Sequence, residues 1–167
     1  RKLLCEPSAN INGFESGYNG AGMKTVLPAE ATAKMDFRLV PDMRPEDIFE
    51  KLRTHLDRQG LEDVELEYLA GVNPARTPIE SPWVALVAET AEEIYDRKPV
   101  IAPTMAGTGP MYEFAEILGM PIATSGVDHP SHKIHAPNEN ITEEDFLLGA
   151  KHAALIMQRF GERGLGG

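Results

Sequence analysis

Residues 31–40 alternate without a break between small or apolar side chains and polar ones. The odd positions are Ala, Ala, Met, Phe and Leu, and the even positions from 32 to 38 are Thr, Lys, Asp and Arg. Successive side chains of a strand point to opposite faces, so this period of two predicts a strand with one buried face. Arg38 lies on its polar face.

A second pattern follows this strand directly. Pro45 opens a segment to about Gln59 whose apolar positions recur at helical spacing: Ile48, Phe49, Leu52 and Leu56. Gly60 is suited to the residue just after the helix. The two patterns together indicate a sheet with helices packed on it.

The rest of the chain continues this mixture. Further strands are predicted at residues 10–14, 64–68, 100–101 and 121–124. Further helices are predicted from Ser81 through Tyr95, from the turn at Gly107 through Leu118, and from Thr142, with Asp145 completing a capping box, to Gly161. The segment 71–78 has two prolines and no periodicity, which indicates a linker between two pieces.

Composition excludes several classes of protein. The chain has 16 Lys and Arg against 26 Asp and Glu, a net charge of −10, which argues against a nucleic-acid partner. It contains no apolar run near the roughly 20 residues needed to span a bilayer, so no membrane partner is expected. The single cysteine, Cys5, fits a reducing compartment such as the cytoplasm.

The loop at residues 128–139 is the first candidate site. It holds three of the five histidines, three positions apart, with Asp128 and Glu139 alongside. Imidazole and carboxylate groups are common metal ligands, but a solvated loop that happens to contain histidines is equally compatible with the spacing. Residues three apart in an extended segment face alternate sides, so at most one or two of these histidines would bind one ion.

Two further candidates would bind an anion. The glycines at 107 and 109 precede a predicted helix, where free N–H groups attract carboxylate or phosphate, although an ordinary strand-to-helix turn has the same appearance. Arg38 has the geometry to grip a carboxylate with two hydrogen bonds, or to pair only with its neighbour Asp36.

Taken together, four segments resemble the two-metal aminoacylase/carnosinase family of metallopeptidases. They are Lys-Thr-Val-Leu-Pro at 24–28, Phe-Arg-Leu-Val-Pro at 37–41, the Ala-Gly-Thr loop at 106–108, and His-Ala-Pro-Asn-Glu at 135–139. That family includes acetylornithine deacetylase, succinyl-diaminopimelate desuccinylase, glutamate carboxypeptidase and cytosolic dipeptidases. The segments occur in the family's order and cover nearly the whole chain.

The resemblance implies a role for each matched residue. His135 would be a metal ligand, with Glu139 supporting its loop. Arg38 would grip the substrate carboxylate, often across a dimer interface in this family, and Gly107 and Thr108 would contact the same end of the substrate. His129 and His132 have no matching role, and no residue of this chain matches the family's general base or its other metal ligands.

The resemblance also implies an α/β architecture in two parts. Residues 1–77 would be part of a lid or dimerisation domain, an open antiparallel sheet with helices on one face. Residues 78–167 would be the C-terminal portion of a discontinuous catalytic domain. We therefore expect a C-terminal fragment of a homodimeric, cytoplasmic hydrolase whose metal-activated water cleaves dipeptides or N-acyl amino acids. The parent would hold two zinc ions, with manganese or cobalt as alternatives.

The fragment by itself is expected to be inactive, because one histidine ligand does not hold two divalent ions. Two rival functions remain at this stage. One is a non-catalytic dimerisation or interaction module that uses the edge of the 31–40 strand. The other is an anion- or nucleotide-binding domain built on residues 107–109, against which the acidic charge of the chain argues.

Overall fold

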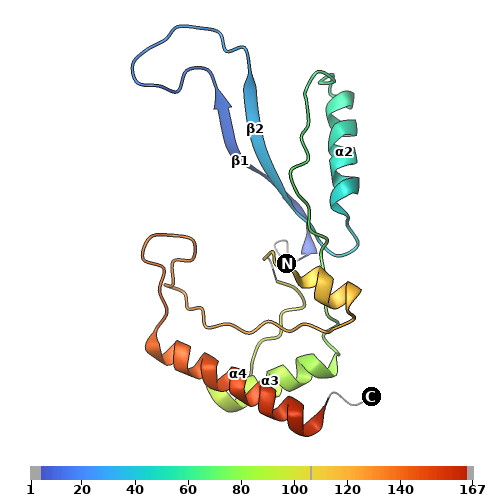
Figure 1. Ribbon diagram of the computed structural model, residues 1–167, viewed down its shortest axis with the longest axis vertical. Helices are drawn as coiled ribbons and strands as arrows, with labels where there is room; N and C mark the ends of the chain where they lie inside the picture. The colour runs from blue at the N-terminus through green and yellow to red at the C-terminus, as the bar shows by residue number, and fades with distance from the viewer. Residues whose placement is uncertain (1–4, 106, 165–167) are drawn as a thin grey trace. The chain divides into compact units, whose positions relative to one another are not determined.

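The structure is a computed structural model that describes residues 5–105 and 107–164 of the 167 in the chain. These residues form two compact units (Figure 1). The first contains residues 5–74 with Gly107 and Thr108, and the second contains residues 75–105 and 109–164. Ala106, which belongs to the third matched segment, lies outside the described residues.

A two-stranded antiparallel hairpin dominates the first unit. β1 (Ser8–Ser16) pairs with β2 (Ala31–Arg38), and a bulge between Ile11 and Gly13 shifts the register. Ile11 and Phe14 are three positions apart, so in a regular strand they would point to opposite faces. The extra residue at the bulge puts both opposite the apolar set of β2, with Ile11 facing Met35 and Phe14 facing Ala33. The predicted α/β class with an open antiparallel sheet is confirmed.

Helix α2 (Pro45–Arg58) begins and ends as its sequence dictates. Pro45 stands at the start, where its missing N–H costs nothing, and Glu46 and Asp47 lie in the first turn. Past the end, Gly60 has a φ of 74°. The amide of Gly60 donates to Asp57 O over 3.1 Å and that of Leu61 donates to Leu56 O over 3.0 Å, the paired bonds of a Schellman motif.

The predicted strand at residues 64–68 is not formed. A strand requires a partner for its backbone groups, and within the described residues the sheet contains only β1 and β2. The segment instead runs beside α2, where the rings of Phe49 and Tyr68 meet edge to face at 5.3 Å. The Arg53 guanidinium donates to the carbonyl oxygens of Leu61 and Val64, which fixes the chain after the helix.

The second unit is built on two helices that pack together, α3 (Pro82–Tyr95) and α4 (Glu143–Arg163). Leu86 and Val87 are its buried apolar side chains, and Trp83 meets Phe160 edge to face at 5.8 Å. The predicted cap of α4 is confirmed, because the Thr142 hydroxyl accepts from the amide of Asp145 over 3.0 Å.

Other expectations for this unit were wrong in detail. Ser81 precedes α3 but its side chain makes no capping bond, and α4 runs past Gly161 to end before Gly164. The segments 100–101 and 121–124 form no strand, since no described segment pairs with them; the amide of Ile122 donates to Thr77 Oγ1 instead, over 2.7 Å. The helical stretch after Gly109 is the short π-helix η1 (Glu113–Ile117).

None of the described helices combines the length and the apolar character that crossing a bilayer requires.

Candidate functional site

The first unit brings two of the predicted anion-binding residues together. Arg38, at the end of β2, donates from Nη1 to Thr108 Oγ1 over 2.9 Å, across 70 positions of sequence. Its Nε lies 3.1 Å from Asp36 Oδ2, one strand repeat away on the same polar face. Of the two alternatives for Arg38, the pair with Asp36 is formed. It does not prevent Arg38 from binding a carboxylate as well, because a guanidinium has five N–H donors.

The Arg38 guanidinium is held in place but keeps N–H donors that are not yet bonded. The Arg38 side chain is 58% exposed, and among the residues that the structure describes nothing bonds to its Nη2. Asp36 holds the Nε side and Thr108 holds Nη1, so the bonds within the described residues leave Nη2 as a donor for a ligand. An incoming carboxylate can therefore be bound by charge-assisted hydrogen bonds from a side chain whose direction is already set.

The bulge in β1 also serves this cluster. Hydrogen bonding from Asn12, the extra residue, is the largest cause that lowers the pKa of Asp36, and Asn10 and the Arg38 charge act in the same direction. Burial opposes them by raising the pKa of the same carboxyl. Asp36 therefore stays ionised, and stays a partner for Arg38, to a lower pH than an ordinary aspartate.

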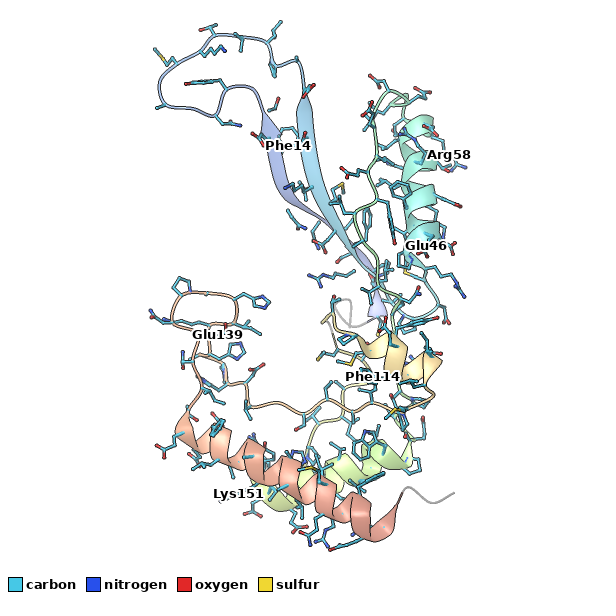
Figure 2. All side chains as sticks on the ribbon, in the orientation of Figure 1. Phe14, Glu46, Arg58, Phe114, Glu139 and Lys151 are labelled. Atoms are coloured by element: carbon cyan, nitrogen blue, oxygen red, sulfur yellow. The ribbon has the colours of Figure 1, made fainter. Side chains whose placement is uncertain are left out.

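The second unit carries the candidate metal ligand. His135 is exposed, and its φ of 58° puts it in the left-handed region that non-glycine residues rarely adopt. Lys133 and Asn138, in the same loop, also have positive φ, 56° and 63°. The amide of His135 donates to Glu139 Oε2 over 3.4 Å, so the predicted supporting residue faces the backbone of the predicted ligand. Glu139 is labelled in Figure 2.

The other two loop histidines form a separate pair. The rings of His129 and His132 meet edge to face at 6.0 Å, and His132 Nδ1 lies 3.4 Å from Asp128 Oδ1. Within residues 5–105 and 107–164, no group of three or more His, Cys, Asp or Glu side chains has the geometry to hold a metal ion. His135 thus offers one suitable donor, and the described residues do not complete a metal cage around it.

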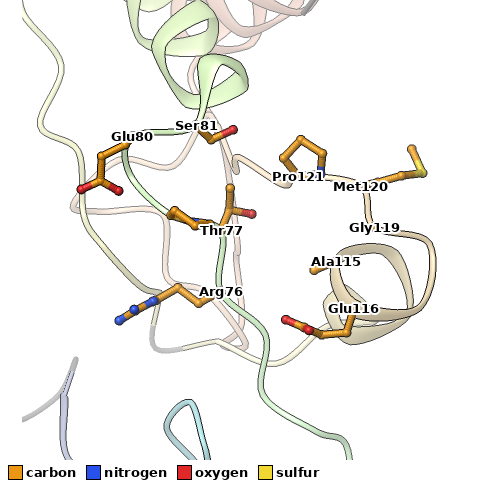
Figure 3. Close-up of a pocket in the computed structure, with 10 residues that line it drawn as sticks. Arg76, Thr77, Glu80, Ser81, Ala115, Glu116, Gly119, Met120 and Pro121 are labelled. Carbon is orange, nitrogen blue, oxygen red and sulfur yellow. The ribbon is translucent and has the colours of Figure 1, made fainter. Parts of the chain in front are cut away.

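The second unit also has a pocket (Figure 3). It is an open hollow of about 590 Å³ between the chain leading into α3 and the end of η1, where Arg76 and Glu80 stand across from Glu116. None of the predicted site residues lines it. Its charges are mixed and its opening is wide, so it does not define a ligand.

Sequence reasoning did not foresee the environment of His152. It belongs to no motif that the sequence singles out, yet it is only 2% exposed and lies among polar partners. Its ring nitrogens lie 3.0 Å from Ser125 Oγ, 3.1 Å from Thr90 Oγ1 and 3.2 Å from Val87 O. The one available signal was a histidine within a run of alanines at 150–154.

Comparison with known proteins agrees with the predicted resemblance. A family model described as Peptidase family M20/M25/M40 matches residues 5–159. The solved structure of an M20 family metallo-carboxypeptidase from Sulfolobus solfataricus is 39% identical, with a TM-score of 0.81, over 94% of this chain and 36% of that one. The dipeptidase Dug1p from Saccharomyces cerevisiae, 22% identical with a TM-score of 0.81, shares the fold over 97% of this chain and 35% of its own.

Curated relatives give the same result. The Beta-Ala-His dipeptidase of Mus musculus is 23% identical over 154 residues, 87% of this chain and 30% of that protein. The Cys-Gly metallodipeptidase DUG1 of Saccharomyces cerevisiae is 23% identical over 167 residues, 93% of this chain and 34% of that protein. The chain therefore spans about a third of the length of the curated relatives it matches.

Asn12→Ala should raise the pKa of Asp36 toward its ordinary value of 3.8, and by more than Asn10→Ala does. A carboxyl whose pKa is lowered by folding stabilises the fold above its ordinary pKa, and this contribution is lost as the pH falls through the lowered value. The variant should thus lose the Asp36–Arg38 pair at a higher pH than the wild type. Carbon-13 NMR of the Asp36 carboxyl measures the titration.

Asn19→Ala is the matched control, since Asn19 bonds to Glu15 and not to Asp36. The same Asp36 titration curve in the wild type and in Asn12→Ala would contradict the assignment.

Proposed function

Because the chain belongs to peptidase family M20/M25/M40, we propose that it supplies part of the active centre of a metal-dependent hydrolase that cleaves the amide bonds of dipeptides or N-acyl amino acids. The observation that carries the proposal is the family match over residues 5–159, which includes both the Arg38 cluster and the His135 loop. Relatives named as dipeptidases and a carboxypeptidase support small peptides as the substrate class.

We assign the substrate carboxylate to Arg38, with Gly107 and Thr108 beside it. The free Nη2 donors and the exposed face of the guanidinium support this assignment. Binding one end of a peptide fixes the position of its scissile amide, and positioning of this kind lowers the barrier to attack.

We assign His135 to the metal. When bound in a site of this type, a divalent ion supplies an activated water at neutral pH. We propose that the general base and the remaining ligands come from the part of the relatives that this chain does not match, and that the isolated chain is inactive; the chain spans about a third of those relatives' length, which supports this. Zinc is the proposed ion, with manganese or cobalt as alternatives that a site of imidazole and carboxylate also accepts.

The same proposal divides the chain by role. Residues 1–77 act as part of a lid or dimerisation domain, and residues 78–167 act as the C-terminal portion of the catalytic domain. The single cysteine, Cys5, is exposed and free, and this supports a reducing, cytoplasmic location.

A chimaera tests the role of His135. This chain replaces the matched segment of the Sulfolobus carboxypeptidase, whose remaining two thirds would supply the missing groups. The chimaera should hydrolyse peptides in a metal-dependent way, whereas the isolated chain with added zinc or cobalt should not. His135→Ala should lower kcat by more than the 10- to 100-fold that loss of a supporting partner of a metal ligand costs.

His129→Ala and His132→Ala are the controls from the same loop, and both should keep activity. A folded His135→Ala chimaera with unchanged kcat, or enzyme-like turnover by the isolated chain, would refute the proposed role.

Arg38→Ala in the same chimaera tests the carboxylate site. Loss of a hydrogen bond to a charged group costs about 1.5–3 kcal/mol, so KM should rise about ten- to hundredfold with a smaller change in kcat. A substrate whose C-terminal carboxylate is replaced by an amide should be insensitive to the substitution. Lys34→Ala, four positions away on the same polar face of β2, should have little effect.

We further propose that the hairpin pairs with a second copy of the chain. The same pairing would be the whole function of the chain under the alternative proposal, in which it is a non-catalytic dimerisation module. Ile11, Phe14 and Met35 on one face of the hairpin are 65%, 71% and 43% exposed, and adjacent exposed apolar side chains of this kind are typical of an interaction surface. The outer edge of β2 also has no partner among the described strands.

Light scattering should therefore give twice the 18.3 kDa chain mass, with or without added zinc. Phe14→Glu should shift the equilibrium toward monomer, and Ile117→Glu, at an equally exposed site in the second unit, should not. A wild-type chain that stays monomeric at millimolar concentration would exclude the dimer for this chain.

A further inference from the structure

The loop that carries His135 is held in an unfavourable backbone conformation. Lys133, His135 and Asn138 all have φ near +60°, at a cost of order 1–3 kcal/mol for each non-glycine residue. Strain of this size persists only where surrounding contacts fix the backbone. The contacts that fix this loop are therefore part of what sets the position of His135.

The first contact is the hydrogen bond between Ser125 and His152. Val87 O is an acceptor only, so in a neutral imidazole Nε2, 3.2 Å away, carries the proton. Nδ1 must then accept, and the Ser125 hydroxyl donates to it over 3.0 Å. The α3 backbone therefore determines which nitrogen of the buried His152 ring carries the proton. The other nitrogen is left as an acceptor for Ser125, an exposed residue at the start of the loop.

The second contact is between Val127 and Gly149. A Cβ added at Gly149 would collide with Cγ1 of Val127, so only glycine lets the chain lie this close to α4. Gly149 and His152 are three positions apart and share a helix face, and Ser125 and Val127 are two apart and share a side of an extended chain. The two contacts thus dock one stretch of chain along one turn of helix.

The far end of the loop returns to the same helix. Thr142 is the N-cap of α4. Between the two ends, the amide of Asn140 donates to His132 O over 3.0 Å and that of Ala136 donates to Lys133 O over 2.9 Å. The loop is a closed Ω-type structure whose two ends are fixed on α4.

We propose that Ser125, His152 and Gly149 are positioning residues that hold the 125–142 loop on α4 and so set the backbone conformation of His135. The inference rests on the proposed role of His135 for its functional meaning, and on the contacts alone for its structural content. The acting groups are the Ser125 hydroxyl, the His152 ring and the space left by the missing Cβ of Gly149.

Hydrogen exchange followed by NMR tests the proposal on the chain itself. Ser125→Ala should make the amides of His132, Ala136 and Asn140 exchange about two- to tenfold faster, the change expected for one lost hydrogen bond. The ring resonances of His135 should shift, while the thermal midpoint of α3 and α4 stays within a few degrees. Ser131→Ala is the matched control, since its hydroxyl bonds to no described residue of this loop.

Gly149→Ala tests the second contact through a double-mutant cycle. It should raise the exchange rates of the same amides, and Val127→Ala should raise them slightly. The double variant should resemble Val127→Ala instead of adding the two effects, because the atom that the new methyl would strike is gone. Additive effects would show that Gly149 acts elsewhere and would remove it from the proposal.

The two proposals fail in distinguishable ways. Equal exchange rates of the loop amides in Ser125→Ala and Ser131→Ala would overturn the positioning inference, whether or not His135 binds a metal. A folded chimaera that keeps its metal-dependent activity in His135→Ala, while loop exchange in the chain responds to Ser125→Ala, would count against the metal role and leave the positioning intact.

Discussion

The second unit depends on a single buried imidazole. His152 is the largest side chain that is almost wholly removed from water, and its interior site is tolerable only because each ring nitrogen has a partner. Tyr95 closes the site with an edge-to-face contact at 5.6 Å. The partners come from the backbone of α3, from a side chain of α3 and from the chain beyond η1. A satisfied polar group of this kind admits fewer alternative packings than an apolar side chain of the same size, so it specifies how the two helices meet.

Few apolar side chains are buried in the described part of this chain, which spans about a third of the length of the relatives it matches. Leu86, Val87 and Pro45 are buried, whereas Met23 and Leu27 in the hairpin turn are almost fully exposed. Local hydrogen bonds also hold the two units: a Schellman motif and the Arg53 bonds after α2, and the Thr142 N-cap before α4. Interhelical ion pairs, Arg159 with Glu93 and Arg163 with Glu89, add to the second unit at its surface.

Features set by neighbouring residues were predictable from the sequence. The strand at 31–38, the helix from Pro45 and the Thr142 cap depend on local periodicity or on one turn of chain, and all three are confirmed. The strand at 64–68 has the right alternation, but a strand exists only with a partner, and pairing is not a local property.

Contacts between residues far apart in the sequence could not be predicted from local patterns. Gly161 was expected to end the last helix, but a glycine inside a helix costs only about 1 kcal/mol. The contact of Phe160 with Trp83 and the Arg163–Glu89 pair help to offset that cost. The sequence singled out Arg38 and Thr108 separately, and nothing local shows that they meet across 70 positions. The Ser125–His152 bond was missed for the same reason, since a histidine among alanines has the appearance of simple packing.

The bulge at Asn12 is not what keeps the apolar face of β1 together. Removing one residue between Ile11 and Phe14 would leave these two side chains two positions apart, and a regular strand already puts such a pair on one face. Loss of Asn12 would instead take away the amide that most favours an ionised Asp36. Related chains without this extra residue should therefore keep the apolar face of the hairpin, while their aspartate holds its arginine over a narrower range of pH.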